Sequence, residues 1–168
     1  MTMRGFLLSF LALSLGFLAP CSSAKVFDAG DSIYVQTSLW TVHFNPDEDH
    51  SNNQRLINVE LEKANHWVFG FALFQNSFDQ PSQYVYGGYL WTLPKTRELA
   101  YFKLTGGILH GYTGEHEDAV PYNYRGFSPG ILPSLWVKYK RIQSEIVLFG
   151  TAGLMWTLGV NFPLGSKK

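Results

Sequence analysis

The segment between residues 66 and 91 constrains the fold more than any other part of the chain. It contains two stretches, 67–73 and 84–91, that alternate like β-strands and are joined by a short polar segment, 75–81. In both stretches each face is aromatic, aliphatic or glycine, and neither face carries a charge. An antiparallel strand with one face in water would alternate apolar and polar residues. The pattern instead indicates strands with lipid outside and a narrow lumen inside.

The N-terminus has the pattern of a secretory signal peptide. Arg4 gives a short positive region, residues 6–18 are apolar, and residues 22–24 are small and suited to cleavage. Such a segment is too short and wrongly flanked to be a retained membrane helix. We therefore expect residues 1–24 to be removed on export and residues 25–168 to form a single-domain mature protein.

The only cysteine, Cys21, precedes the expected cleavage site. A lipoprotein signal around it is the weaker alternative, because Pro20 stands where a small residue is required. Cleavage after Ala24 leaves a mature chain without a thiol, which excludes disulfides, cysteine catalysis and Cys-ligated metals.

The composition of the chain fits an exported membrane protein. Charged residues make up 15% and aromatic residues 16%, whereas soluble domains carry about 25% charged residues. Once Arg4 is removed, 12 basic residues face 13 acidic ones, so there is no basic field for nucleic acid. After the signal peptide no apolar run approaches the roughly 20 residues of a spanning helix. A closed β-barrel in an outer membrane is the common solution for such a chain.

The sequence predicts an all-β fold, an eight-stranded antiparallel transmembrane barrel. The expected strands are 33–44, 54–62, 66–75, 83–93, 99–112, 130–140, 142–149 and 152–162. Most are close to the about 9–11 residues that a tilted strand needs to cross the hydrocarbon. In the second strand Asn58, Glu60 and Glu62 alternate with apolar residues and should face the lumen. In the last strand every second residue from Leu154 to Phe162 should face lipid.

The connections between the expected strands alternate in length. The short ones are 63–65, 94–98 and 140–141, and the longer polar ones are 44–53, 76–82 and 113–124. Short periplasmic turns and long outer loops are typical of outer-membrane barrels, which predicts that both termini are periplasmic. The alternative is a soluble lipocalin-like barrel, which would require polar outward faces.

A histidine and a serine are the best candidates for chemistry. His43 ends the first expected strand and Asn76 and Ser77 end the third, both on the outer side, with one strand between them. A His beside a Ser suits acyl transfer, with imidazole as general base and an amide as oxyanion donor. A rim histidine and a loop serine without any function are the simpler alternative. No ligand spacing supports a metal site, and no cofactor is expected.

Three further features lie near the expected lumen or rim. Pro129 and Pro133 suggest a place where neighbouring strands part to admit a lipid chain, or else simply the start of a strand. Gly88, beside Gly87 in mid-strand, suggests either the floor of a chain-shaped pocket or relief of strand curvature. Arg125 is placed to meet a lipid phosphate.

The order of several motifs resembles a known family. The motifs are Trp40-x-x-His43, Phe74-x-Asn76-Ser77-Phe78 with Pro81 soon after, Gly87-Gly88 with Trp91, and Asn123-Tyr124 before the sequence PGILP at 129–133. They resemble the PagP family, outer-membrane lipid A palmitoyltransferases, in patches from about residue 40 to residue 133. The resemblance implies that a palmitoyl chain moves from a glycerophospholipid to lipid A. It also implies that His43 and Ser77 are catalytic, Gly88 measures the chain, and Pro129 or Pro133 marks a gate.

Two departures from the family pattern bear on activity. The family has an aspartate where this chain has Asn76, which cannot supply a negative charge to an imidazolium. The family's N-terminal amphipathic helix is also missing, since only residues 25–31 precede the first expected strand. Some similar sequences carry a glycerol-3-phosphate transporter label instead.

Together these features predict a monomeric outer-membrane acyltransferase whose partners are a glycerophospholipid donor and a lipid A acceptor. The main alternative is a non-catalytic barrel, either a transporter or a structural protein. An apolar lumen under His43 would favour the enzyme, and a continuous polar channel would favour transport. A soluble lipid carrier is the third possibility.

Overall fold

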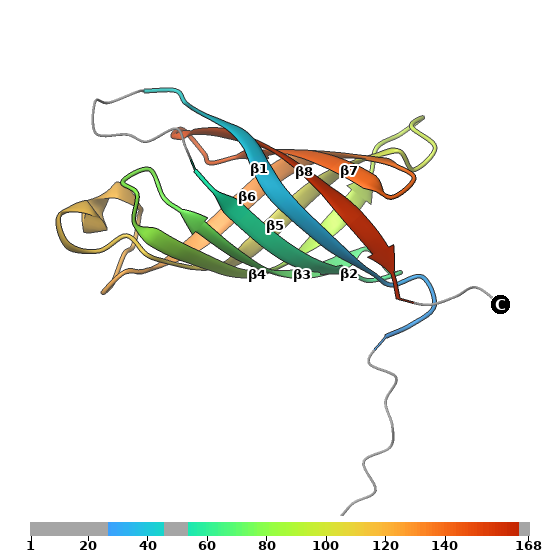
Figure 1. Ribbon diagram of the computed structural model, residues 1–168, viewed down its shortest axis with the longest axis horizontal. Coiled ribbons are helices and arrows are strands. Elements are labelled where there is room, and N and C mark those ends of the chain that lie inside the picture. Colours follow the sequence, from blue (N-terminus) through green and yellow to red (C-terminus); the bar gives the residue numbers. More distant parts are fainter. Residues whose placement is uncertain (1–26, 46–53, 165–168) are drawn as a thin grey trace, which may run out of the picture.

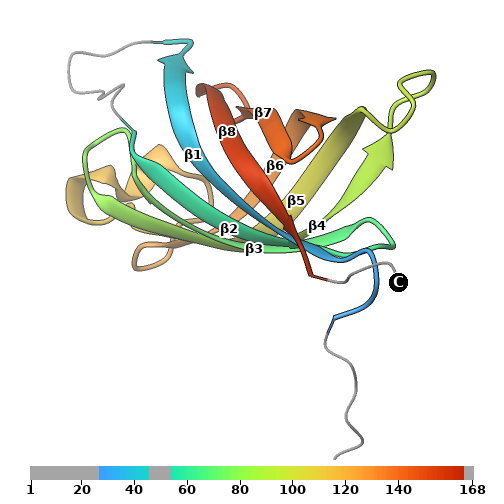
Figure 2. The same ribbon diagram turned by 45° about the vertical axis from the view of Figure 1, so that its right-hand side comes forward.

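Eight antiparallel strands close into a barrel in the computed structural model, which describes residues 27–45 and 54–164. Each strand pairs with the next, and β1 pairs with β8 to complete the ring (Figures 1 and 2). The strands are β1 (Ser32–His43), β2 (Leu56–Glu62), β3 (Trp67–Gln75), β4 (Pro81–Thr92), β5 (Ala100–His110), β6 (Phe127–Tyr139), β7 (Ile142–Leu148) and β8 (Gly153–Pro163). The predicted fold is confirmed. The predicted signal peptide lies outside the described residues.

Most strand ends lie within about two residues of their predicted positions, and the main difference is at β6. This strand begins at Phe127 rather than at residue 130. Pro129 and Pro133 therefore lie inside the strand, paired with Ile108 and Leu104 of β5. Pairing with β7 begins only at Ser134, so Pro129 and Pro133 have no β7 partner in the register. Proline, which lacks an N–H, is tolerated on such a free edge.

The outer surface of the barrel is apolar. In β8, Trp156, Leu158 and Val160 are 44%, 38% and 41% exposed, whereas Thr157 and Asn161 are 1% and 3% exposed. This alternation confirms the predicted outward row of the last strand. An apolar exterior suits lipid hydrocarbon and not the aqueous surroundings of a lipocalin-like barrel.

In the described part of the chain, no helix is long and apolar enough to cross a membrane.

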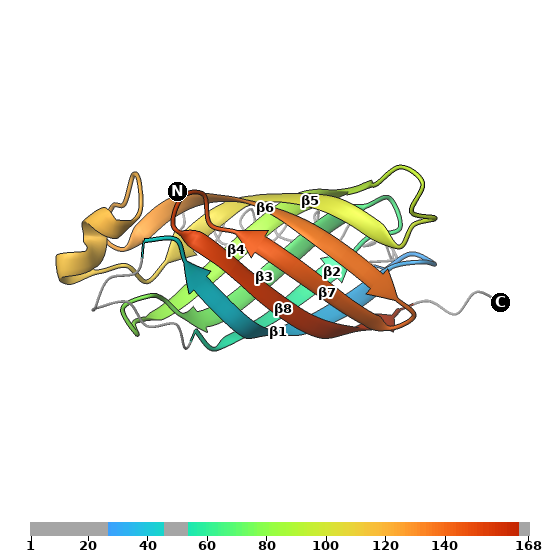
Figure 3. The same ribbon diagram turned by 90° about the horizontal axis from the view of Figure 1, so that it is seen from above.

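The two rims of the barrel differ in their connections. Ser32 at the start of β1 pairs with Pro163 at the end of β8, so both ends of the described barrel lie at one rim, here called the terminal rim. The β4–β5 and β6–β7 turns lie at the same end (Figure 3). The opposite, loop rim carries the 3₁₀ helix η1 (Gly114–Ala119) (Figure 1). The predicted long and short connections therefore segregate to opposite rims, and the short β7–β8 turn, 149–152, joins the long ones at the loop rim.

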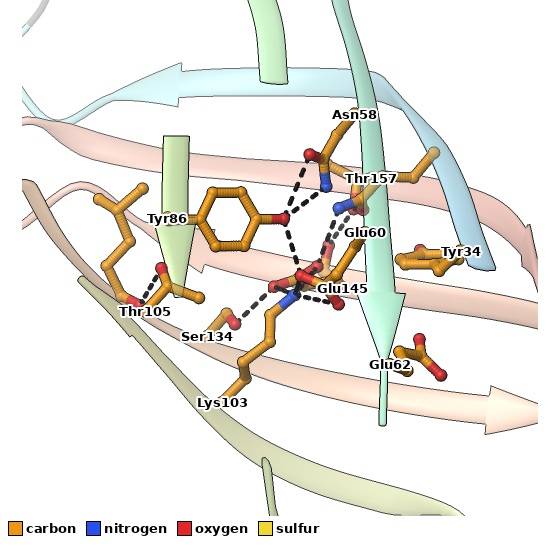
Figure 4. A network of polar contacts seen from close by, with 12 residues as sticks. Tyr34, Asn58, Glu60, Glu62, Tyr86, Lys103, Thr105, Ser134, Glu145 and Thr157 are labelled. Carbon is orange, nitrogen blue, oxygen red and sulfur yellow. Dashed lines mark hydrogen bonds and ion pairs between the residues drawn. The ribbon is translucent and has the colours of Figure 1, made fainter. Parts of the chain in front are cut away.

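A charged network crosses the middle of the lumen. Lys103 of β5 reaches Glu60 of β2 and Glu145 of β7, both at 2.9 Å, and all three side chains are at most 3% exposed. The Tyr86 hydroxyl donates to Glu60 at 2.7 Å, and Ser134 Oγ donates to Glu145 at 2.5 Å (Figure 4). The inward orientation predicted for Glu60 and Glu62 is confirmed, since both are buried. Because its members come from five strands, β2, β4, β5, β6 and β7, the network ties opposite walls of the barrel together.

A buried carboxylate at the terminal rim makes stability depend on pH. Burial raises the pKa of Asp31, but hydrogen bonds from Lys63 and from the backbone amides of Asp28 and Ala64 outweigh this effect and hold the pKa below its ordinary value of 3.8. A carboxyl with a lowered pKa stabilises the fold above its unfolded pKa, and this stabilisation is lost as pH falls through the folded value.

We therefore expect the stability advantage of the native protein over Asp31→Asn to be full near neutral pH and to fade below about pH 3.8. Urea unfolding at a series of pH values, followed by tryptophan fluorescence, measures the difference. The control is Asp118→Asn, which removes an exposed carboxyl of η1. A difference between native protein and Asp31→Asn that stays constant through the acid range would contradict the assignment.

Candidate functional site

A β-bulge in β1 turns His43 into the lumen. The register of β1 against β8 shifts between Ser38 and Trp40, which leaves Leu39 as the extra residue. Leu39 and Trp40 are consequently both exposed, at 48% and 61%. Before the bulge the even-numbered residues face inward, and after it the inward residues are Thr41 and His43, which are 2% and 9% exposed. Bulges commonly re-aim side chains in this way next to functional sites.

Ser77 meets His43 at the loop rim. The Nε2 atom of His43 lies 3.0 Å from Ser77 Oγ. Gln54, just before β2, donates from Nε2 to the same Oγ at 3.3 Å. Because Gln54 occupies one lone pair of Ser77 Oγ, the hydroxyl can direct its proton at Nε2 of His43. This arrangement requires the imidazole to carry its own proton on Nδ1. The structure thus brings together the two residues that the sequence singled out as base and nucleophile.

Tyr112, just beyond β5, is a further side chain at Ser77. Burial raises the pKa of the Tyr112 hydroxyl, and a hydrogen bond with Ser77 acts in the opposite direction. Neither Tyr112 nor Gln54 stood out in the sequence. For Gln54 a signal was present, because it lies an even number of residues from Asn58 and Glu60 and therefore falls on the same, inward face as they do. For Tyr112 there was none, because its position depends on how the outer loops fold.

Asn76 is fully buried, and its side chain is used to shape the loop that carries Ser77. Its Oδ1 accepts from the backbone amides of Phe78 and Gln80, at 2.9 and 3.0 Å. Its Nδ2 donates to Gln80 Oε1 at 3.3 Å and to the carbonyl of Gly111 at 3.4 Å. Side-chain bonds to the backbone a few residues on are the usual means by which asparagine closes a turn. Both amide hydrogens therefore already have partners within the loops, away from the His43–Ser77 contact.

The loop around Ser77 is held against the loop that follows β5. The rings of Phe78 and His116 stack at 3.9 Å with an angle of 7° between their planes. Gln80 and the backbone of Thr113 also exchange two hydrogen bonds, at 3.1 and 3.3 Å. His116 is partly buried by this stacking, although in the sequence it lies among acidic residues, because its packing partner belongs to another loop. These contacts fix the position of Ser77 at the rim.

An apolar layer lies on the inner wall between this rim and the charged network. Its buried part is Ala72, Tyr84 and Tyr86, and the two tyrosine rings stack at 4.9 Å. Four partly buried apolar side chains pack against them: Leu56, Phe74, Leu109 and Leu132. Below them the network from Glu60 through Lys103 to Glu145 crosses the lumen. The interior therefore changes from a largely apolar layer on the β2–β6 side, with the polar Thr41 and Gln36 below His43 on β1, to a charged network at mid-depth.

The remaining predicted residues lie apart from the His43–Ser77 contact. Gly88 pairs with Thr105, and an added Cβ would lie 2.4 Å from the carbonyl oxygen of Leu104. The close approach of β5 therefore explains why a glycine is needed there. Arg125 is exposed at the loop rim, in a left-handed conformation (φ 52°), with its guanidinium 5.4 Å from the centre of the Tyr124 ring.

No cluster of three metal-ligating side chains occurs within residues 27–45 and 54–164. His110 lies on the lipid side of the wall, with its ring 4.3 Å from that of Phe127. His66 lies at the terminal rim, where Nδ1 is 3.1 Å from the carbonyl oxygen of Leu90. Within the described residues, His43 is therefore the histidine that meets a serine side chain inside the barrel.

Comparison with known proteins finds similar solved structures but no match by sequence. No family model and no curated protein matches the chain. Among solved structures, the chain is similar to the outer membrane protein Ail of Yersinia pestis in a phospholipid bilayer nanodisc. The sequence identity is 16%, the TM-score is 0.46, and the match covers 80% of this chain and 99% of the other. The barrel itself is established by the closed ring of strand pairs.

Proposed function

We propose that this protein is an outer-membrane acyltransferase that moves a long acyl chain, palmitoyl in the first instance, from a glycerophospholipid to lipid A. The observation that supports it best is the 3.0 Å contact between His43 Nε2 and Ser77 Oγ at the mouth of the barrel. The apolar exterior supports the location, because such a surface requires lipid around it.

In the proposed reaction Ser77 Oγ attacks the ester carbonyl carbon of the donor lipid while His43 Nε2 takes the hydroxyl proton. The tetrahedral intermediate then collapses, the lysophospholipid alkoxide leaves, and the imidazolium returns the proton to it. A hydroxyl of lipid A attacks the acyl-serine in the same manner and restores Ser77. Gln54 Nε2 and the Tyr112 hydroxyl, which already contact Ser77, are the nearest donors for the developing oxyanion.

Access for a lipid chain is provided in this proposal by the free edge of β6. Pro129 and Pro133 lie where β6 is paired with β5 but not with β7. A chain entering there would meet the apolar side chains Leu132 and Leu109 on the inner wall. The transport alternative is less well supported, because the ion pairs of Lys103 with Glu60 and Glu145 cross the lumen.

The test is mass spectrometry of lipid A from cells that lack their own palmitoyltransferase and express this chain. We expect the mass of one added palmitoyl group with the native sequence and its loss in Ser77→Ala and His43→Ala. His110→Ala is the matched control, because it removes a histidine from the lipid-facing side of the same rim. No added mass from protein folded in the outer membrane, or an added mass that survives in both variants, would overturn the proposal.

A further inference from the structure

A groove of about 590 Å³ lies on the outer wall at the terminal rim. It runs between the β4–β5 turn, the end of β6 and the start of β7. The groove is hollow because two small residues, Ala100 and Ser144, lie between larger ones. Exposed apolar side chains form its walls, with Leu99, Val137 and Ile142 at 51%, 52% and 55% exposure.

The mouth of this groove is basic. Lys95 and Arg97 of the β4–β5 turn line it, whereas Lys138, which also borders the groove, turns its ammonium inward to Glu62 and the Trp136 ring. Lys138 is 3.8 Å from Glu62, whereas no ion pair of the described chain involves Lys95 or Arg97. Lys140 extends the positive charge, with its ammonium 5.4 Å from the centre of the Tyr139 ring. Two exposed cations thus stand beside an apolar surface, and the exposed carboxylate of the same turn, Glu98, forms no ion pair with either of them.

The turn that carries these cations is held in place by hydrogen bonds. The amide of Leu93 donates to the carbonyl of Ala100 at 2.9 Å, and Thr96 Oγ1 donates to the carbonyl of Leu93 at 2.7 Å. The amide of Lys138 donates to the carbonyl of Leu99 at 2.8 Å, which ties the turn to β6. The charges of Lys95 and Arg97 are therefore carried on a turn fixed beside the groove.

We propose that this groove binds a glycerophospholipid with an anionic head group. The phosphate lies between Lys95 and Arg97, and one acyl chain lies along Leu99, Val137 and Ile142. A guanidinium and an ammonium match phosphate oxygens, and the apolar wall matches a hydrocarbon chain. Tyr139, 68% exposed beside the groove, suits the boundary between head group and chain. The site lies at the opposite rim from His43 and does not depend on acyl transfer.

Native mass spectrometry tests the proposal on the full mature protein in detergent with equal amounts of dioleoylphosphatidylglycerol and dioleoylphosphatidylethanolamine. We expect the phosphatidylglycerol adduct to be retained preferentially. We expect the preference for phosphatidylglycerol to fall on the order of fivefold in Arg97→Gln, which removes one charge. The double variant Lys95→Gln/Arg97→Gln removes a second charge and should lower the preference by about the same factor again. Arg55→Gln is the matched control, since Arg55 is an exposed arginine at the opposite rim. Ala100→Phe fills the groove without changing the charge and should lower retention of both lipids.

Several outcomes would overturn this assignment. Equal retention of the two lipids by the native protein would exclude head-group recognition. Equal losses in Arg55→Gln and Arg97→Gln would mean attraction by overall charge alone. Displacement of the adduct by inorganic phosphate, together with unchanged retention in Ala100→Phe, would mean a phosphate site without a lipid chain. Circular dichroism of each variant confirms that the barrel is folded.

Discussion

Replacing Lys103 by methionine is expected to destabilise the barrel by about 3–5 kcal/mol, the cost of removing one partner from a buried ion pair. The ammonium lies 2.9 Å from both Glu60 and Glu145, and all three groups are almost inaccessible to water. Without it two carboxylates face each other in the lumen, where neither can be hydrated. Urea unfolding in lipid vesicles, followed by tryptophan fluorescence, measures the loss.

A second variant separates charge from packing. The triple change Lys103→Met/Glu60→Gln/Glu145→Gln removes the carboxylates together with the ammonium, and should recover most of the lost stability. A buried ion pair often contributes little beyond a neutral replacement of similar volume, because desolvation offsets the attraction. If the triple variant is as unstable as Lys103→Met, the loss comes from the shape of the lysine chain and the electrostatic explanation fails.

Replacing Asn76 by alanine is expected to cost about 3 kcal/mol and to abolish acyl transfer together with the His43–Ser77 contact. The change leaves the amides of Phe78 and Gln80 without their acceptor in a partly buried loop, and each donor left unpaired out of reach of water costs about 1–3 kcal/mol. Because these bonds shape the turn that presents Ser77, the loss affects the site as well as the stability. Unfolding in urea and the lipid A assay report the two effects separately.

Two matched variants sharpen this prediction. Asn76→Asp keeps the acceptor for Phe78 and Gln80 but replaces the donor to Gln80 and Gly111 by a carboxylate oxygen, so we expect a cost of about 1–3 kcal/mol. Asn65→Ala removes an exposed asparagine whose side chain accepts a long hydrogen bond, 3.4 Å, from the amide of Trp67, and it should change little. An Asn76→Ala protein as stable as Asn65→Ala would show that the loop does not depend on this side chain.

The regular part of the fold was predictable because it depends on local alternation. The inward carboxylates of β2 and the outward row of β8 follow from a side-chain period of two, which a single strand displays by itself. The bulge at Leu39 was not predictable, because it exists only relative to the register of β8. Strict alternation along β1 would place His43 on the face opposite to Tyr34. His43 faces inward only because the bulge shifts the register of β1 against β8.

The candidate site was predictable in its pair but not in its surroundings. His43 and Ser77 end strands on the same side, separated by one strand, and this placed them together. The contacts of Asn76 with Gly111, and of Phe78 with His116, join loops that no local pattern relates. In the sequence Lys103 is likewise a single lysine in a strand without a carboxylate. Its partners Glu60 and Glu145 belong to strands across the lumen, which no local pattern relates to it.

The pairing of β1 with β8 has a consequence for how this protein is made. The β8 partners of Ser32 through His43 lie more than a hundred residues further along the chain, so the ring cannot close until β8 has been synthesised. Until then the first strand exposes an unpaired edge, which is a ready template for pairing with other chains. Contacts so far apart in sequence also form slowly. The unclosed chain must therefore be kept apart from its neighbours until β8 is in place, and loss of β8 would leave β1 and β7 both open to misassembly.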